Sequence, residues 1–294
     1  MSLWQRWRQA LARKPGPQSQ WFLLAGWCQA SELSAPPLER LQPIYPPDEA
    51  FWADPFAWQR DGRFYVFFEE YPYATRRGRI SVVELDERAK PAGEAKPVLK
   101  QPWHLSYPYL FKFEGELYML PEQKESRRID LYRCVDFPGR WERVKTLMSG
   151  MRLVDANLFE HEERWWLLCA AKLKWQGLRY DETLFAFHAD SPLSERWIPH
   201  PANPLVRDFS RARPAGRVLR DTQGRLLRPS QDCARRYGDG LNISEILELT
   251  PITYRERLLW HKSGREAGGW NGMHHIDWHQ GLLVMDAQRL IIIP

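Results

Sequence analysis

The chain has 294 residues, of which 44% are hydrophobic, so it can bury the core of one large domain. Because Pro is excluded from helix interiors and central strands, the 23 Pro residues predict a fold rich in turns and loops. The formal net charge of +5 mildly favours an anionic partner, although a solvated basic surface accounts for it as well. No block of Lys and Arg with interleaved aromatics resembles a nucleic-acid-binding module, so we expect no nucleic-acid partner.

Residues 1–14 have the pattern of a short basic amphipathic helix, with Trp and Leu on one face and Arg beside it. Such a helix either packs on its own domain or makes weak peripheral contact with an anionic membrane. The stretch Pro15–Pro17 would end it. We therefore expect an N-terminal basic segment over residues 1–20 and a single domain over residues 21–294.

From Asp54 onward one unit recurs: an apolar stretch, a tight polar turn and a second apolar stretch. The five turns begin at Asp61, Glu114, Glu162, Gln223 and Gln280, which are 53, 48, 61 and 57 residues apart. Asp-Gly between alternating apolar residues is a strong hairpin signal. Further strand-like segments separate the copies, at residues 79–85, 129–135, 184–189 and 243–249.

A period of roughly fifty residues with four strands in each copy is the signature of a β-propeller. In the first copy both faces of the second strand are apolar, as expected for a strand between two neighbouring sheets. The predicted fold class is therefore all-β, a five-bladed β-propeller preceded by the short helix. A β-sandwich with irregular loops is the alternative.

In a propeller the innermost strand of each blade starts at the rim of a central funnel, so residues at that position converge. Polar or ionisable side chains occupy it in all five copies: Asp54; Tyr107; Asp155; Arg211 and Arg213; His274, His275 and Asp277. A second ring is expected from the far ends of the following strands: Glu69, Glu70, Glu122, Arg228, Gln231, Asp232 and Asp286.

Two carboxyl groups across a cleft are what cleavage of a glycosidic bond requires, one ionised and the other protonated. Arg, His and Tyr would then hold a sugar. The paired His274 and His275 fit metal ligation, sugar contact or burial in the core. Because no second His pair or Cys supports a transition-metal site, we expect no metal ion and no other cofactor.

Six stretches carry a resemblance to a known family: FWADPFAWQRDGRFYVFFEEYPY, SYPYLFKFEGELYMLPE, DANLFE, WIPHPANP, RPSQDCARRYG and GMHHID. With them the chain resembles the five-bladed propeller superfamily of arabinanases, β-xylosidases, invertases and levansucrases. It looks most like the propeller in the N-terminal part of plant glucosamine inositolphosphorylceramide transferases and in bacterial stand-alone relatives. The resemblance extends from about Trp21 to the C-terminus.

The resemblance to the hydrolases implies roles for four residues. Asp54 would be the catalytic base, Asp155 the carboxylate that tunes the acid, and Glu122 or His275 the acid. An acidic His would resemble the anhydrogalactosidase branch of the superfamily. The second-blade Asp-Pro position is Tyr107-Pro108 here, a departure from the hydrolase pattern. The substrate-binding residues expected beside them are Glu70, Tyr107, Arg211, Arg213, Arg228, Gln231, Asp232, His274 and Asp277.

Two functions from different classes remain open. The first is a glycoside hydrolase or transglycosidase with Asp54 as base, acting in cell-envelope polysaccharide or glycolipid metabolism. The second is a non-catalytic propeller that binds a glycan or glycolipid beside a glycosyl- or formyltransferase. Four scattered Cys without a CxxC pair and no secretory or membrane-spanning apolar run favour a cytoplasmic setting, with peripheral contact at the inner membrane through residues 1–14.

Overall fold

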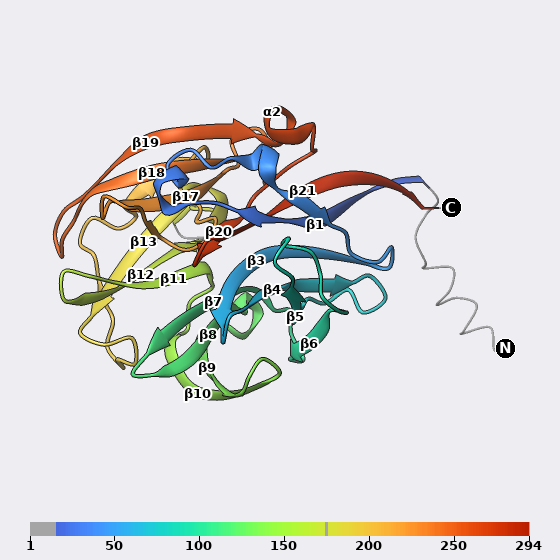
Figure 1. Cartoon of the computed structure of the whole chain (residues 1–294). Helices are drawn as coiled ribbons and strands as arrows, with labels where there is room; N and C mark the ends of the chain where they lie inside the picture. Colours follow the sequence, from blue (N-terminus) through green and yellow to red (C-terminus); the bar gives the residue numbers. More distant parts are fainter. Residues whose placement is uncertain (1–15, 174–175, 294) are drawn as a thin grey trace, which may run out of the picture.

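The computed structural model describes residues 16–173 and 176–293. They form five antiparallel sheets placed side by side in a ring, which confirms the predicted all-β five-bladed propeller (Figure 1). The helix predicted at residues 1–14 lies outside the described residues. The first strand already begins at Gly16, ahead of the expected start of the domain at Trp21.

The blades follow one another along the chain. The first contains β3 (Ala50–Arg60), β4 (Arg63–Pro72), β5 (Arg79–Leu85) and β6 (Lys96–Leu99). The second contains β7 (Ser106–Phe113), β8 (Glu116–Glu122), β9 (Arg128–Asp136) and β10 (Arg140–Ser149). The third contains β11 (Leu153–His161), β12 (Arg164–Ala171), β13 (Thr183–Ala189) and β14 (Ile198–Pro199), with β15 (Val206–Arg207) paired to β13.

The fourth blade contains β16 (Leu219–Arg220), β17 (Leu226–Asp232), β18 (Gly240–Leu249) and β19 (Tyr254–Ser263), and the short helix α2 (Gly264–Gly268) follows it. The fifth combines β20 (Ile276–His279) and β21 (Leu282–Ile293) with β1 (Gly16–Trp27) and β2 (Gln42–Ile44). Short 3₁₀ turns lie at Ala30–Glu32, Leu38–Arg40, Lys124–Ser126 and Tyr180–Glu182.

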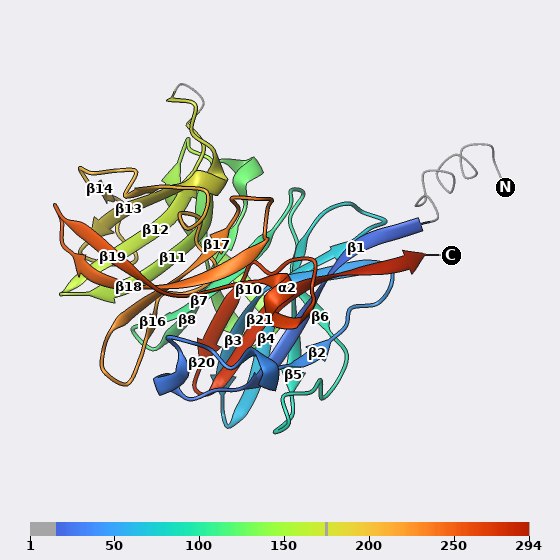
Figure 2. The same ribbon diagram turned by 90° about the horizontal axis from the view of Figure 1, so that it is seen from above.

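The fifth blade closes the ring with strands from both ends of the chain. β1 and β21 pair over all twelve residues of β1, from Gly16 opposite Ile293 to Trp27 opposite Leu282. The two strands run side by side in both views (Figures 1 and 2). Closure of this kind leaves no long unpaired edge between the first and last blades.

The core lies between the blades because each middle strand is apolar on both faces. In β4, Val66 and Phe68 pack toward the fifth blade, where they share a cluster with Leu23. The intervening Phe67 packs toward the second blade in another cluster. Full burial of each such side chain contributes about 1.5–3 kcal/mol. The uninterrupted apolar runs in the sequence therefore reflect sheets that are covered on both sides.

Candidate functional site

A β-bulge recurs at one position of three innermost strands. The pairing shifts between Ala53 and Phe56 in β3, and at the corresponding places in β7 and β11. The first residue of the bulge is Asp54 in β3, Tyr107 in β7 and Asp155 in β11, and their φ angles are 51°, 47° and 53°. Such left-handed backbone in a non-glycine residue costs on the order of 1–3 kcal/mol and is found where a side chain must be re-aimed. The repeated bulge gives these three side chains matched positions at the funnel.

Asp286, in β21, fixes the junction between the first and fifth blades. Its carboxylate accepts the backbone N–H groups of Asp54, His274 and His275, each at 3.0 Å. It also lies 2.7 Å from the His274 ring nitrogen Nδ1. Burial alone would favour the neutral forms, but the two opposite charges outweigh it, so the pKa of Asp286 is lowered and that of His274 is raised. The two groups therefore form a buried ion pair.

Asp54 lies beside this ion pair. One carboxyl oxygen accepts the N–H of Tyr107 at 3.2 Å, and the other is 3.8 Å from His274 Nδ1 and 3.7 Å from His275 Nδ1. Burial raises the pKa of Asp54 to about 7 against the lowering effect of His274, and the charge of Asp286 adds to the rise. Near neutral pH the carboxyl group is thus divided between its two protonation states.

Asp155 is the second carboxyl group at a bulge, and it pairs with Arg213. The Arg213 Nε lies 2.5 Å from Asp155, and the same guanidinium reaches Asp181 at 2.9 Å. Burial raises the pKa of Asp155 to about 6 although Arg213 lowers it, and the nearby Glu122 carboxyl group raises it further. Asp155 and Glu122 therefore face one another across the second and third blades.

Two further carboxyl groups reach the funnel from strand ends. Glu122 ends β8 and lies 3.3 Å from Lys124 Nζ. Glu69 lies 3.2 Å from His104 Nε2, and burial raises its pKa well above the usual range, with the charges of Asp54 and Glu122 adding to the rise. Several carboxyl groups thus share one buried site, and each makes ionisation of the others less favourable.

Tyr107 joins three blades at the centre. Its hydroxyl oxygen accepts hydrogen bonds from Asn157 Nδ2 and from the backbone N–H of Gly216, both at 2.9 Å. The side chain is 1% exposed. Tyr107 therefore lies at the base of the site and fixes its neighbours.

His275 is fully buried between two aromatic rings. The ring centroids of Phe56 and Tyr107 lie 4.6 and 5.1 Å from it. Burial lowers the pKa of His275 to about 3, so the imidazole is neutral at neutral pH. A neutral imidazole is a poor general acid, which leaves Glu122 as the better candidate for that role.

Comparisons with known proteins show the family to which the chain belongs. The family model "Glucosamine inositolphosphorylceramide transferase 1, N-terminal" matches residues 44–288. The chain belongs to this family. It is 34% identical to glucosamine inositolphosphorylceramide transferase 1 of Oryza sativa subsp. japonica over 254 residues, and 34% identical to that of Arabidopsis thaliana over 240 residues. These matches cover 82% and 78% of this chain but 33% and 30% of the relatives, so the chain spans about a third of their length.

Solved structures share the fold at much lower identity. The catalytic domain of a GH62 α-L-arabinofuranosidase from Coprinopsis cinerea has a TM-score of 0.58 at 12% identity, with 83% of this chain and 94% of that one covered. The α-L-arabinofuranosidase PaAbf62A from Podospora anserina, solved with cellotriose, has a TM-score of 0.58 at 10% identity, with 84% and 94% covered. These likenesses establish the propeller architecture alone.

Several residues expected to bind substrate hold the propeller together instead. Arg228 is 1% exposed and lies 2.8 Å from Glu256, and Gln231 donates to the carbonyl of Pro214 at 3.1 Å. Asp277 is fully buried, lies 2.6 Å from Arg217 and accepts the N–H of Ala57. The position of a residue at a strand end does not reveal which way its side chain points.

Three more predicted residues have partners outside the cluster of carboxyl groups. Glu70 pairs with Arg79 at 2.8 Å, Arg211 with Asp208 at 3.2 Å, and Asp232 with His261 at 3.0 Å. Alternation along β4 explains the first case, because adjacent residues point to opposite faces and Glu69 takes the inward position.

The structure adds two aromatic side chains that the repeat pattern did not single out. The Tyr237 ring lies 4.9 Å from the Arg213 guanidinium and 5.2 Å from the His274 ring, and Tyr237 remains 48% exposed. Trp21, in β1, stacks on His274 with ring centroids 4.0 Å apart. The RPSQDCARRYG stretch contained a signal for Tyr237, whereas Trp21 joins the site only because the ring closes.

Asp54, His274 and Asp286 place one potential metal-ligand atom each within 4.8 Å of one another. The short contact between His274 Nδ1 and Asp286 shows that two of these atoms already form an ion pair with one another. We therefore assign no ion to this group.

Proposed function

We propose that this propeller acts on a glycan, and that its funnel cleaves or transfers a glycosidic bond with Asp54 as general base. The observation that carries the proposal is the pair of buried carboxyl groups at equivalent bulges, Asp54 and Asp155, whose pKa values burial raises to about 7 and about 6. Carboxyl groups that titrate near neutral pH suit proton transfer. One such group as the base, and a second beside the proposed acid Glu122, fit the requirements of glycosidic chemistry.

The proposed roles follow from the neighbours of each group. Asp54 in its ionised form removes a proton from water or from an acceptor hydroxyl. Glu122 gives a proton to the departing glycosidic oxygen, and Asp155, with Arg213, tunes Glu122. Tyr237 offers an exposed ring at the rim on which a sugar face can stack. Because Asp54 must be ionised, turnover rises with pH through about 7.

The name of the plant relatives supports a glycolipid or glycan as the ligand. They are called glucosamine inositolphosphorylceramide transferases, and this chain matches about a third of their length. From this name we infer only the class of ligand: a glycan or glycolipid of the cell envelope, handled beside a biosynthetic transferase.

A cytoplasmic setting, peripheral at the inner membrane, is part of the proposal. The four Cys, all with free thiols, support a reducing compartment. Among the described residues no helix is long and apolar enough to cross a bilayer.

A specific observation favours glycan binding without catalysis as the second candidate. Asp155 is held by Arg213 at 2.5 Å, and Tyr107 occupies the second-blade position where the hydrolases have Asp. A site with one bulge carboxylate neutralised and another replaced can bind hydroxyl groups without activating water.

Replacing Asp54 with Asn separates these candidates. Asp54→Asn keeps the shape and an acceptor for the Tyr107 N–H but removes the proton acceptor. If Asp54 is the base, turnover of an envelope oligosaccharide falls by about 10²–10⁴-fold while affinity changes little. Both quantities should be measured on one ligand, by calorimetry and by product analysis. Asp232→Asn is the matched control, because Asp232 pairs with His261 outside the cluster.

The result that would overturn the enzyme proposal is a wild-type protein that holds an oligosaccharide tightly and releases no product from it. Equal turnover by the wild type and Asp54→Asn would instead remove Asp54 from the mechanism.

A further inference from the structure

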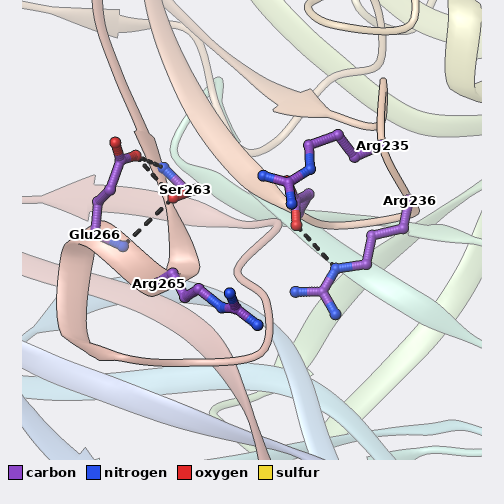
Figure 3. Close-up of a pocket in the computed structure, with 6 residues that line it drawn as sticks. Arg235, Arg236, Ser263, Arg265 and Glu266 are labelled. Atoms are coloured by element: carbon purple, nitrogen blue, oxygen red, sulfur yellow. Dashed lines mark hydrogen bonds and ion pairs between the residues drawn. The ribbon is translucent and has the colours of Figure 1, made fainter.

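A hollow of about 430 Å³ lies between the loop that follows β17 and the start of α2 (Figure 3). Its walls are formed by Arg235, Arg236, Asp239, Ser263, Arg265 and Glu266. Three guanidinium groups thus meet two carboxylates in one small space. The Arg235, Arg236 and Arg265 side chains all extend toward the same opening.

Both carboxylates of the hollow are already engaged. Asp239 lies 2.8 Å from Arg236 Nε. Glu266 accepts hydrogen bonds from the backbone N–H and the hydroxyl group of Ser263, at 2.9 and 2.7 Å. Two of the three guanidinium groups have fewer partners: Arg235 is 3.8 Å from Asp239, and Arg265 makes no ion pair within the described part of the chain. Arg236, by contrast, also donates to the carbonyl of Asn271. The hollow therefore keeps a surplus of guanidinium N–H donors.

The same loop forms the rim of the funnel. Tyr237 follows Arg236 directly and contacts both Arg213 and His274. At Gly238 the backbone passes so close to Trp21 and His274 that an added Cβ would lie 3.0 and 3.2 Å from their atoms. A ligand held by Arg235 would thus sit two residues along the chain from Tyr237 at the aromatic rim.

We propose that this hollow binds the phosphoryl group of a phosphorylated glycan whose sugar enters the funnel. The inference rests on the proposed function for the sugar but not for the phosphoryl group. Guanidinium groups match phosphate oxygens in pairs, and a phosphoryl group presents up to three acceptor oxygens to converging donors. A carboxylate, with two oxygens and a single charge, would use fewer of these donors.

The test uses inorganic phosphate and a sugar monophosphate in place of an oligosaccharide, so that its result does not depend on the Asp54 experiment. Inorganic phosphate and glucose 1-phosphate are titrated by calorimetry into the wild type and into the double variant Arg235→Gln, Arg265→Gln. Arg236 is left in place because it pairs with Asp239. The matched control is Arg127→Gln, Arg152→Gln, which removes the same charge from a second basic hollow lined by Arg127, Arg152, Lys172 and Tyr180.

We expect the Arg235/Arg265 variant to bind both phosphates at least about tenfold more weakly, and the control variant to match the wild type. If both double variants bind phosphate equally weakly, only the general positive charge of the protein matters, and the proposed phosphate site is wrong. Unchanged binding by the Arg235/Arg265 variant would overturn it as well. Glucuronate, a sugar carboxylate, should bind more weakly than glucose 1-phosphate; tighter binding would contradict the preference for phosphate.

The source of the phosphoryl group is decided by a further arm with vesicles. Sedimentation with phosphatidylcholine vesicles containing phosphatidylinositol tests a lipid head group, and inositol phosphate in solution is the competitor. Sedimentation that depends on Arg235 and Arg265 supports a phosphoryl group on a lipid. Binding of the soluble phosphates alone supports a soluble phosphorylated sugar. If the wild-type protein binds none of these phosphates while neutral glycans still bind its funnel, the proposed function stands and the phosphate site alone fails.

Discussion

At the scale of single residues, the funnel is defined by carboxyl groups that are buried close together. Asp54, Glu69 and Asp155 all have raised pKa values, first because of burial and then because of one another. Asp286, by contrast, has a lowered pKa and is kept ionised by His274 and by three backbone N–H groups. The site therefore keeps protons bound near neutral pH. Above that pH the buried carboxyl groups must ionise, and the folded state becomes less stable.

This cost predicts an effect of pH on stability. Because the pKa of Asp54 rises from 3.8 to about 7 on folding, the folded state retains a proton that the unfolded state loses. The stabilisation is fully present below about pH 4 and is lost as the pH rises through about 7. Asp54→Asn removes this titration. The melting temperature of the variant should therefore rise relative to that of the wild type as the pH increases from about 5 to about 8. Thermal unfolding across this range measures the difference.

Asp221→Asn is the control with the opposite sign. Although burial alone would raise it, the pKa of Asp221 is lowered because Arg225 and backbone N–H groups hold its carboxylate. This stabilisation exists above the unfolded pKa and is lost in acid. Asp221→Asn should therefore be destabilised at neutral pH. A uniform decrease for both variants would show that the Asp54 carboxyl group does not titrate in this range.

At the scale of elements, the repeated bulge joins the sequence repeat to the site. Equivalent bulges in β3, β7 and β11 carry Asp54, Tyr107 and Asp155. The same backbone feature therefore presents a carboxyl group in two blades and a phenol in the third. The phenol has a different task from the carboxyl groups. It accepts hydrogen bonds from the third and fourth blades, at Asn157 and Gly216.

Removal of this hydroxyl group should destabilise the propeller centre. Tyr107→Phe leaves the buried N–H of Gly216 without its acceptor, at about 1–3 kcal/mol, and takes one of two acceptors from Asn157 Nδ2, at about 0.5–1.5 kcal/mol. We therefore expect the free energy of unfolding to fall by about 2–4 kcal/mol. Tyr109→Phe is the comparison, since the Tyr109 hydroxyl group makes one hydrogen bond, to the carbonyl of Leu158. Denaturant unfolding of both variants gives the two values. A loss no larger for Tyr107→Phe than for Tyr109→Phe would contradict this role.

At the scale of the whole molecule, closure through β1 and β21 makes the ends of the chain part of one sheet. Trp21, in β1, also reaches the site by stacking on His274. The start of the chain is therefore coupled to the funnel, although about 250 residues of the sequence lie between these two rings.

Two truncations test what the first residues contribute. Deletion of residues 1–27 removes β1 and should abolish cooperative unfolding, because β21 loses the strand that pairs with its whole length and keeps only the short pairing with β20. Deletion of residues 1–15 should leave the melting temperature unchanged but abolish sedimentation with anionic vesicles, since the basic Trp- and Leu-rich segment is proposed to contact the membrane. Equal sedimentation by the shorter and full-length proteins would end the membrane proposal.

The sequence by itself determined the architecture. The five turns from Asp61 to Gln280 marked five hairpins, and two-sided apolar strands such as Phe64–Phe68 marked sheets covered on both faces. These are local signals, because turn chemistry and side-chain alternation act over a few residues. The same repeat logic pointed to Asp54, Glu122, Asp155, Arg213 and His274, which the fold does bring together.

Only the tertiary structure decided which polar strand ends face the funnel and which tie blades together. Glu69 and Glu70 are adjacent in the chain, yet one reaches the buried cluster and the other pairs with Arg79. Arg228 and Asp277 looked equivalent to funnel residues until Glu256 and Arg217 proved to be their partners. The reason is physical: burial and ion pairing depend on residues that are distant in sequence, and a buried charge is stable only where such a partner meets it.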